Sequence, residues 1–213
     1  MEFRWIGRIR YADGLAMQET LVAERQAGRI PDTVLLLEHE PVYTIGRTRD
    51  RASLGEPERL PHPVVETNRG GQATWHGPGQ LVGYPIIDLQ PRGRDLHHYL
   101  RALEQAQIDF LKDCGIPDAG RREGLTGVWI GDRKIASIGV GVRRWVTMHG
   151  FALNIGSDLA GFDAIVPCGI AGVAMTSLSR ESGTEWTVEA AAMAIRPMLS
   201  AALGSLGRNE DPH

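Results

Sequence analysis

Apolar positions in the first part of the chain predict strands separated by one helix. The segment at 11–27 has helical spacing, and Gly28 stands just past its end, where helices usually stop. The run TVLLLE at 33–38 is apolar, suits a strand, and ends before Pro41. The expected elements here are strands at 4–9, 33–38 and 42–45 and a helix at 11–27.

The middle of the chain combines a polar segment with the clearest helical pattern. Residues 46–68 are polar and contain proline, which predicts a long loop, and long loops in compact domains are often functional. The apolar segment at 81–89 predicts a buried strand. A helix is expected over 95–111, where apolar residues recur on one face: Leu96, Tyr99, Leu100, Leu103, Ala106 and Phe110.

Residues 127–155 predict a run of three strands, at 128–130, 134–142 and 146–155. The dipeptide Gly131-Asp132 between the first two strands suits a tight hairpin turn. Strands that follow one another with short turns pair in antiparallel fashion. We therefore expect an antiparallel meander in this half of the chain.

A last helix is expected over 188–203, which is rich in alanine and methionine. Thr187 can cap this helix, and Glu189 lies in its first turn, where a negative charge is favourable. The elements together predict an α/β (α+β) fold and a single catalytic domain over residues 1–213. A smaller C-terminal subdomain that begins near residue 184 is the alternative.

Composition and charge exclude several classes of function. The hydrophobic fraction of 42% and the charged fraction of 23% are ordinary globular values, so a disordered chain is not expected. The formal net charge of −3 and the pI near 6.2 give no reason to expect a nucleic-acid partner, which usually requires a basic surface. No stretch approaches the roughly 18 apolar residues of a membrane span.

The first residues, MEFRW, lack the basic-then-apolar pattern of a signal peptide. We therefore expect a cytoplasmic protein whose thiols stay reduced. The two cysteines, Cys114 and Cys168, are too few for a disulfide framework. Cys114 ends the predicted helix before Gly115, whereas Cys168 lies in the sequence IVPCGI.

The most informative stretch is residues 69–84, RGGQATWHGPGQLVGY. Glycine permits positive φ angles and a close approach of the backbone to a ligand, so this stretch is a candidate binding loop. The alternative is a glycine-rich turn between two strands. A phosphate-binding P-loop is disfavoured, because no Lys-Ser/Thr pair follows the glycines.

Two further stretches, GDRKIASIGVG at 131–141 and TMHGFALNI at 147–155, are rich in small residues. If the two strands lie side by side, their small residues form a flat floor on which an acyl chain or a flat ring can lie. Alternation assigns Ser137, Gly139 and Gly141 to one face of the first strand. Alternation likewise assigns Met148, Gly150, Ala152 and Asn154 to one face of the second.

Lys134 opens the first of these strands, and strict alternation places it on the face opposite Ser137 and Gly139. A β-bulge between Lys134 and Ser137 would bring them to one face. The sequence leaves both directions open.

Cys168 is a candidate nucleophile, because a lone cysteine in an intracellular enzyme that also contains histidines often has this role. Pro167 before it and Gly169 after it indicate a constrained loop, which favours a function. A thiol attacks at neutral pH only when its thiolate is stabilised, for example by a cation such as Lys134. In an apolar pocket, a neutral lysine can instead accept a proton. A Cys–Lys pair can thus perform acyl transfer, with cysteine as nucleophile and lysine as general acid and base. A small buried hydrophobe is the alternative for Cys168.

Together these stretches resemble the octanoyl-[acyl-carrier-protein]:protein octanoyltransferase family of lipoate biosynthesis. The resemblance rests on motifs in the family's order: Arg69-Gly70-Gly71, Thr74-Trp75-His76-Gly77-Pro78-Gly79-Gln80, Lys134-Ile135-Ala136-Ser137-Ile138-Gly139, His149-Gly150-Phe151-Ala152-Leu153-Asn154 and Pro167-Cys168-Gly169-Ile170. The upstream HEPVYTIGR at 39–47 also looks familial. Two mild departures, Trp75 where tyrosine is commoner and Phe151 where leucine is commoner, affect the expected chain-length preference more than the reaction.

The resemblance implies a biotin/lipoate-protein ligase-like domain with a mixed, largely antiparallel sheet flanked by helices. It implies an acyl-thioester on Cys168, with Lys134 lowering the pKa of the thiol and relaying protons, and no metal or cofactor. The implied partners are octanoyl-acyl carrier protein and the lipoyl domains of 2-oxoacid dehydrogenase E2 subunits and of glycine cleavage H protein. The implied substrate-binding residues are Arg69, Gly70, Gly71, Gln72, Ala73, Thr74, Trp75, His76, Ser137, Ile138, Gly139, His149, Gly150, Phe151 and Ala152.

For His76 and His149, a structural or positioning role is favoured over acid–base chemistry. Arginines occur in groups that can steer an acidic carrier protein toward the enzyme: Arg47, Arg49 and Arg51; Arg92 and Arg94; Arg121 and Arg122; Arg143 and Arg144.

Three rival functions share parts of this pattern. An ATP-dependent lipoate- or biotin-protein ligase would form an acyl-adenylate and would need no cysteine at position 168. An octanoyl amidotransferase would keep the cysteine and differ in substrate preference. A non-catalytic lipoyl-domain or fatty-acid binding module would bind without turnover.

Overall fold

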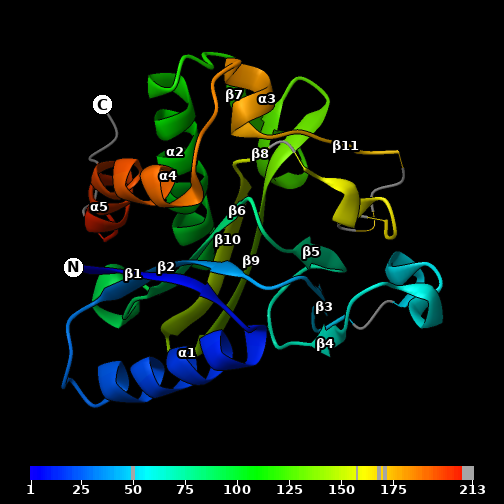
Figure 1. Ribbon diagram of the computed structural model, residues 1–213. Coiled ribbons are helices and arrows are strands. Elements are labelled where there is room, and N and C mark those ends of the chain that lie inside the picture. The colour runs from blue at the N-terminus through cyan, green and yellow to red at the C-terminus, as the bar shows by residue number, and fades with distance from the viewer. Residues whose placement is uncertain (49–50, 157, 167–168, 170–171, 208–213) are drawn as a thin grey trace.

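The computed structural model describes residues 1–48, 51–156, 158–166, 169 and 172–207. Its centre is a mixed sheet of eight strands (Figure 1). The neighbouring strands are, in order, β1 (Glu2–Ile9), β2 (Thr33–His39), β6 (Gln80–Ile86), β10 (Val146–Asn154), β9 (Arg133–Arg143), β8 (Leu125–Ile130) and β7 (Ala119–Arg122). A short strand, β11 (Ala174–Met175), pairs with the start of β9. The pairs β1–β2 and β11–β9 are parallel and the other pairs of this sheet are antiparallel. The prediction of a mixed, largely antiparallel sheet is confirmed.

Helices cover both faces of this sheet. In Figure 1, α2 (Leu96–Asp113), α4 (Val188–Ala194) and α5 (Arg196–Gly204) lie above the sheet, and α1 (Tyr11–Gln26) lies below it. The fully buried strand β2 shows how the two cores form, because Val34 and Leu36 pack with α2, α4 and α5, whereas Leu35 and Leu37 pack with α1. A strand buried on both faces reads as a continuous apolar run, which is the pattern of TVLLLE.

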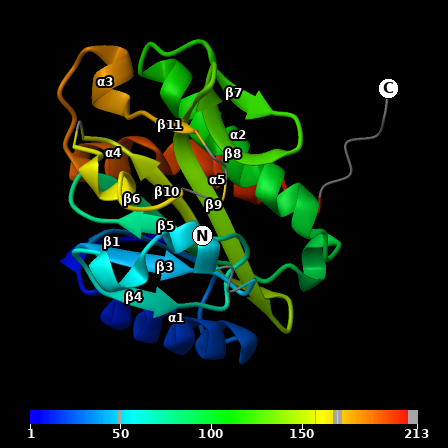
Figure 2. The same cartoon turned by 90° about the vertical axis from the view of Figure 1, so that its right-hand side faces the viewer.

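A smaller sheet, β4 (Val64–Glu66), β3 (Val42–Ile45) and β5 (Thr74–His76), lies in front of the large sheet in Figure 2. It has its own apolar cluster, which includes Tyr43, Ile45, Trp75 and Phe162. Phe162 comes from the short helix η4 (Ala160–Phe162), so this cluster joins the small sheet to the segment that precedes position 168.

Most predicted elements are confirmed, and two predictions are wrong. The single helix expected at 188–203 is two helices, α4 and α5, because Pro197 in the first turn of α5 has no N–H for a continuous helix. The segment at 46–68 is not a plain loop. It contains the short helices η1 (Arg51–Leu54) and η2 (Pro57–Arg59) and the strand β4.

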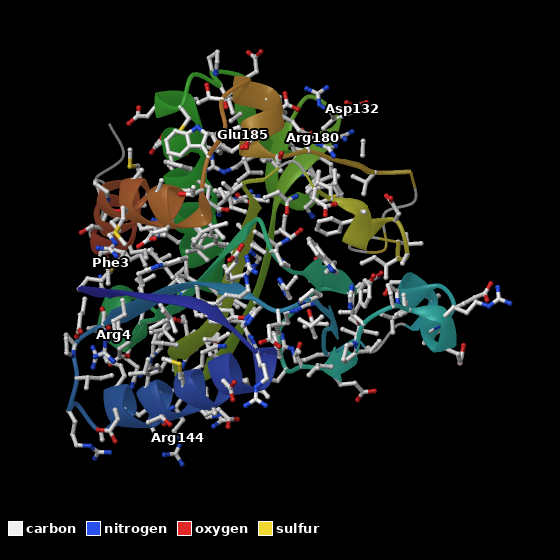
Figure 3. All side chains as sticks on the ribbon, viewed as in Figure 1. Phe3, Arg4, Asp132, Arg144, Arg180 and Glu185 are labelled. Carbon is white, nitrogen blue, oxygen red and sulfur yellow. The ribbon has the colours of Figure 1, made fainter. Side chains whose placement is uncertain are left out.

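The hairpin between β8 and β9 turns at Gly131, with φ of 60°, as predicted. Asp132 and Arg144, which flank β9, lie at opposite ends of the molecule in Figure 3. Two further short helices in the described part of the chain are η3 (Gln90–Arg92) and α3 (Leu178–Ser182). The division of the chain into one domain, with or without a C-terminal subdomain, stays a prediction, and α4 and α5 pack into the same core as α2.

None of the helices in the described part of the chain is both long enough and apolar enough to cross a membrane.

Asp32 ties three segments together at one edge of the sheet. Its carboxylate accepts hydrogen bonds from Arg25 Nε (2.8 Å), from Arg92 Nη2 (2.6 Å) and from the backbone N–H of Asp88 (3.1 Å). Burial acts to raise the pKa of Asp32, but these donors outweigh it and hold the pKa below its ordinary value. The charged form of Asp32 therefore stabilises the fold.

We predict that Asp32→Ala lowers the free energy of unfolding by about 3 kcal/mol, because it removes the carboxylate that pairs with Arg92 and leaves Arg25 with the more distant carboxylate of Asp88 (3.8 Å). Urea denaturation at neutral pH measures the change. The control is Glu56→Ala, which removes an exposed ion pair with Arg59 and should cost at most about 1 kcal/mol. Equal losses in the two variants would contradict the structural role of Asp32.

Candidate active site

A cavity of about 470 Å³, part of it open to solvent, lies between α1, the loop at 69–72 and strands β5, β6, β9 and β10. The lining residues come from segments far apart in the chain: Tyr11, Arg69, Gly71, Gln72, Thr74, His76, Val82, Tyr84, Ser137, Ile138, Gly139, His149, Gly150, Phe151 and Ala152.

The floor of the cavity is the pairing of β9 with β10. Ser137 pairs with Ala152 and Gly139 pairs with Gly150, so the predicted floor of small residues is present. The glycine-rich loop lies directly on it, because a Cβ atom at Gly139 would stand 2.8 Å from the carbonyl oxygen of Gly70. Only a residue without a side chain permits this close approach.

Arg69 fastens the loop to its surroundings. Its guanidinium is buried and donates hydrogen bonds to the carbonyl oxygens of Gly70, Thr44 and Gln72 (each 2.9 Å) and to Thr44 Oγ1 (2.7 Å). Arg69 thus shapes the cavity wall by binding oxygens of the protein itself. Its positive charge also disfavours protonation of the nearby histidines.

His76 is held in one tautomer by its neighbours. Gln80 Nε2 donates to Trp75 O (3.2 Å) and to Asn154 Oδ1 (2.9 Å), so Gln80 Oε1 must be the acceptor that faces His76 Nδ1 (2.8 Å). His76 Nδ1 therefore carries the proton, and Nε2 can accept from Thr44 Oγ1 (3.3 Å). Burial, followed by the nearby His39, lowers the pKa of His76 to about 3. His76 is neutral at physiological pH.

His149 has an unusual backbone. Its φ is 56°, the left-handed region, which is strained for a residue other than glycine. The His149 N–H donates to Gln18 Oε1 on α1 (2.7 Å), so a side chain of the helix holds this part of β10.

The side chain of His149 lines the cavity, and its Nε2 contacts Asn68 Oδ1 (2.6 Å). Burial lowers the pKa of His149 to about 4, and the charge of Arg69 adds to the effect. The next residue is Gly150. A Cβ atom at this position would stand 2.2 Å from the carbonyl oxygen of Gly83, which explains the glycine after His149.

Tyr11 and Tyr84 complete the cavity wall, and His39 contacts both of them from outside the lining. His39 Nδ1 faces the carbonyl oxygen of Ile9 (3.1 Å), so it carries the proton, and His39 Nε2 accepts from the hydroxyl of Tyr84 (2.7 Å). Burial lowers the pKa of His39 to about 4. Burial also raises the pKa of Tyr11 to about 12 and the pKa of Tyr84 well above its ordinary value. These cavity groups are uncharged at neutral pH.

Lys134 lies outside the cavity lining, although its side chain is buried. The pairs Trp129↔Lys134 and Val128↔Ala136 leave Ile135 as an extra residue, so β9 contains a β-bulge between Lys134 and Ser137. Ile135 and Ala136 both join the core beneath α2. Lys134 thus lies on the other face, with its Nζ 5.2 Å from the centre of the Trp129 ring.

Pro167, Cys168 and Ile170 lie outside the described residues. The segments on either side of them are described. Gly169 packs against the side-chain amide of Gln72, a cavity residue, because a Cβ atom at Gly169 would overlap it. Ala174 and Met175 form β11 beside Arg133 and Lys134. The segments that flank Cys168 thus contact both the glycine-rich loop and the strand of Lys134.

Three of the predicted substrate-binding residues do not line the cavity: Gly70, Ala73 and Trp75. Trp75 and Ala73 pack into the cluster of the small sheet, where Trp75 contacts Phe162 with a ring-centre distance of 5.4 Å. The alternation of side chains along β5 explains why Trp75 does not line the cavity, since Thr74 and His76 face the cavity and Trp75 faces away. Three further residues line the cavity that no sequence motif indicates: Tyr11, Val82 and Tyr84.

Within the described part of the chain, no three His, Cys, Asp or Glu side chains are grouped so that they could hold a metal ion.

Comparison with known proteins identifies the family of this chain. Residues 10–199 match the family described as "Lipoyl protein ligase A/B catalytic domain". An octanoyltransferase of Geobacter sulfurreducens is 57% identical over 190 residues, which cover 89% of this chain and 79% of the relative. An octanoyltransferase of Citrifermentans bemidjiense is 52% identical over 204 residues, 94% of this chain and 98% of the relative.

Solved structures share the fold at low sequence identity. Lipoate-protein ligase A bound with ATP has a TM-score of 0.71 and 17% identity, with 96% of this chain and 86% of that chain covered. The Aquifex aeolicus biotin protein ligase in complex with biotin and ATP has a TM-score of 0.60 and 12% identity, with coverages of 98% and 72%. The fold is therefore that of the lipoate-ligase group, as predicted. The family match and the close relatives together show that the chain belongs to the lipoyl protein ligase A/B catalytic-domain family and is an acyltransferase of its octanoyltransferase branch, which acts in lipoate biosynthesis.

Proposed function

We propose that this protein transfers an octanoyl group from octanoyl-acyl carrier protein to a lysine of a lipoyl domain, through a thioester on Cys168. The observation that carries the proposal is the convergence of three segments. The flanks of Cys168 contact Gln72 of the cavity wall at Gly169 and the strand of Lys134 at β11. An acyl chain in the cavity would then have its reactive end near Cys168 and Lys134.

The reaction has two balanced steps. The Cys168 thiolate attacks the carbonyl carbon of the octanoyl thioester, and a new C–S bond forms. The bond to the phosphopantetheine sulfur breaks, and that thiolate leaves with the proton of the Lys134 ammonium, which becomes a neutral amine. The ε-amine of the acceptor lysine then attacks the enzyme thioester. The amide bond forms, the Cys168 thiolate leaves, and Lys134 accepts the proton that the amine loses.

The cavity has the chemistry that an uncharged acyl chain requires. Its lining histidines and tyrosines are neutral at physiological pH. His76 bonds to Gln80, His149 to Asn68 and Tyr84 to His39. The small-residue floor presents backbone surface against which we propose that the extended chain lies. The proposed substrate-binding set is the predicted set without Gly70, Ala73 and Trp75 and with Tyr11, Val82 and Tyr84 added.

A lipoyl domain is the proposed acceptor, and 2-oxoacid dehydrogenase E2 subunits and glycine cleavage H protein are the proposed sources of that domain. A thiol nucleophile needs a reducing compartment, so we place the reaction in the cytoplasm. The thioester donor is already activated, so the proposed reaction needs neither ATP nor a metal. An ATP-dependent ligase is the alternative, since the fold alone is shared with such enzymes.

Intact-protein mass spectrometry tests the mechanism. We predict that octanoyl-acyl carrier protein, without ATP, adds one octanoyl mass to the enzyme and that an added lipoyl domain removes it. Cys168→Ser should abolish the adduct. The control is Cys114→Ser, the only other cysteine, which caps the end of α2 and should leave the adduct intact.

The opposite outcome is equally clear. If the wild-type enzyme forms no adduct and modifies the lipoyl domain only when ATP and free octanoate are supplied, the protein is a ligase. An adduct that persists in Cys168→Ser would place the thioester elsewhere.

The buried histidines predict a loss of stability in acid. Burial holds the pKa of His149 at about 4, against 6.5 in the unfolded chain, so the unfolded state takes up protons first as the pH falls. The stability is complete above about pH 6.5 and is lost as the pH approaches 4. Each such histidine should contribute a loss of roughly 2 kcal/mol between pH 7.5 and pH 5.

We expect His149→Asn to lose roughly 2 kcal/mol less than the wild type over this interval, as measured by urea denaturation at both pH values. Any contribution of the carboxylates is common to both proteins and cancels. His97→Asn, at an exposed position, is the control and should lose as much as the wild type. An unchanged pH dependence in His149→Asn would show that His149 is not held neutral by burial.

A further inference from the structure

A glycine lies under the side chain of Lys134. A Cβ atom at Gly127 on β8 would stand 2.9 Å from Cε and 3.5 Å from Nζ of Lys134, and 2.5 Å from the carbonyl oxygen of Ala136. The first and last distances are shorter than real Cβ contacts. The methylene groups of Lys134 thus lie where a side chain at position 127 would be.

The backbone of Gly127 is also special. Its φ is 123°, a conformation that residues with a side chain rarely adopt. Gly127 precedes the point where β8 loses simple register with β9, so the backbone here departs from a regular strand. Two features therefore explain the glycine at position 127. The neighbouring strand leaves no space for a Cβ atom, and the backbone has a φ angle that residues with a side chain rarely adopt.

A buried carboxylate from α2 holds Gly127 in place. Glu104 Oε1 accepts the N–H of Gly127 (3.0 Å), and the side chain of Glu104 is only 1% exposed. Its other oxygen accepts from Arg101 Nη1 (2.7 Å) and from Arg121 Nε (2.9 Å), so the charge is paired toward the surface. Such a charge-assisted bond to a backbone N–H is stronger than a bond between neutral groups.

The tip of Lys134 lies against a third residue of this region. Nζ is 5.2 Å from the centre of the Trp129 ring, within the range of a cation–π contact. The bulge at Ile135 is what sets Lys134 beside Trp129 on β8, because the two residues are register partners. The lysine is thus guided along its stem by Gly127 and at its tip by Trp129.

We propose that Gly127, fixed by Glu104, and Trp129 form a cradle that sets the direction of the Lys134 side chain, and that Gly127 and Glu104 are positioning residues for the acyl-transfer reaction. The proposal rests on the proposed function, in which Lys134 accepts a proton. A methyl group at position 127 would displace Cε of Lys134, and a small displacement of a proton acceptor slows the reaction strongly.

The chain contains only two lysines, Lys112 and Lys134, and Lys112 is exposed on α2. NMR of protein labelled with ¹³C at the lysine ε-carbons therefore gives two signals, one of which is an internal control. In the wild type we expect the Lys134 ε-protons to show nuclear Overhauser contacts to the Trp129 indole and to the Gly127 α-protons. Absence of these contacts in the wild type would overturn the proposal without any variant.

Gly127→Ala should move the Lys134 signal, because the stem leaves its place over the glycine, and should not move the Lys112 signal. The control is Gly131→Ala in the adjacent turn, which also has positive φ but has no atom within 4 Å of the added Cβ. If both variants move the Lys134 signal equally, general strain of the hairpin explains the effect and the proposal fails.

Single-turnover kinetics supply the functional test. With enzyme already loaded with octanoyl, we expect Gly127→Ala to slow transfer to the lipoyl domain by about 10- to 100-fold and to leave KM for octanoyl-acyl carrier protein nearly unchanged. Glu104→Gln keeps an acceptor for the Gly127 N–H and should be milder than Glu104→Ala. Equal rates for these two variants, or an unchanged rate in Gly127→Ala, would contradict the positioning role.

The two levels of the proposal fail separately. If Lys134→Ala transfers octanoyl at the wild-type rate, the proposed role of Lys134 in the reaction is wrong, whatever the NMR contacts show. If Lys134→Ala is inactive while Gly127→Ala is fully active, the reaction stands and the cradle is wrong.

Discussion

The close pairing of β9 with β10 is the constraint on which the site depends. Because Gly139 faces Gly150 and Ser137 faces Ala152, the sheet has a flat area where backbone, and not side chain, forms the surface. The backbone of the glycine-rich loop can then pack on this area. Arg69 holds the loop there by donating hydrogen bonds to the carbonyl oxygens of Gly70 and Gln72. Larger residues at these positions would separate the loop from the sheet.

A buried polar network extends this constraint across the molecule. His76 bonds to Gln80, Gln80 to Asn154, and Asn154 Nδ2 donates to the carbonyl oxygen of Thr176, whose N–H donates to the carbonyl oxygen of Lys134. Each donor in this chain has an acceptor, so the cost of burying these groups is offset. This network therefore links His76 in the cavity wall to the backbone of Lys134.

The sequence predicts the local parts of this site well. The hairpin at Gly131 and the alternation along 134–142 and 147–155 were enough to predict the floor, because both depend on neighbours within one meander. Tyr11 and Tyr84 could not be found in this way. Their place depends on α1 packing beside His39 and β6, which are contacts between residues far apart in the chain. The break before α5 was visible in Pro197 and was overlooked.

The direction of Lys134 shows why a site can be harder to predict than its fold. One extra residue, Ile135, reverses the face of Lys134 relative to Ser137, and a bulge is a property of two strands and not of one. The direction of Lys134 depends on its pairing with β8, where Trp129 pairs with Lys134 and Val128 pairs with Ala136. With this pairing, both Ile135 and Ala136 are buried in the core beneath α2. The apolar pair thus turns the charged side chain to the opposite face. Packing that has no part in the chemistry determines where the chemistry can occur.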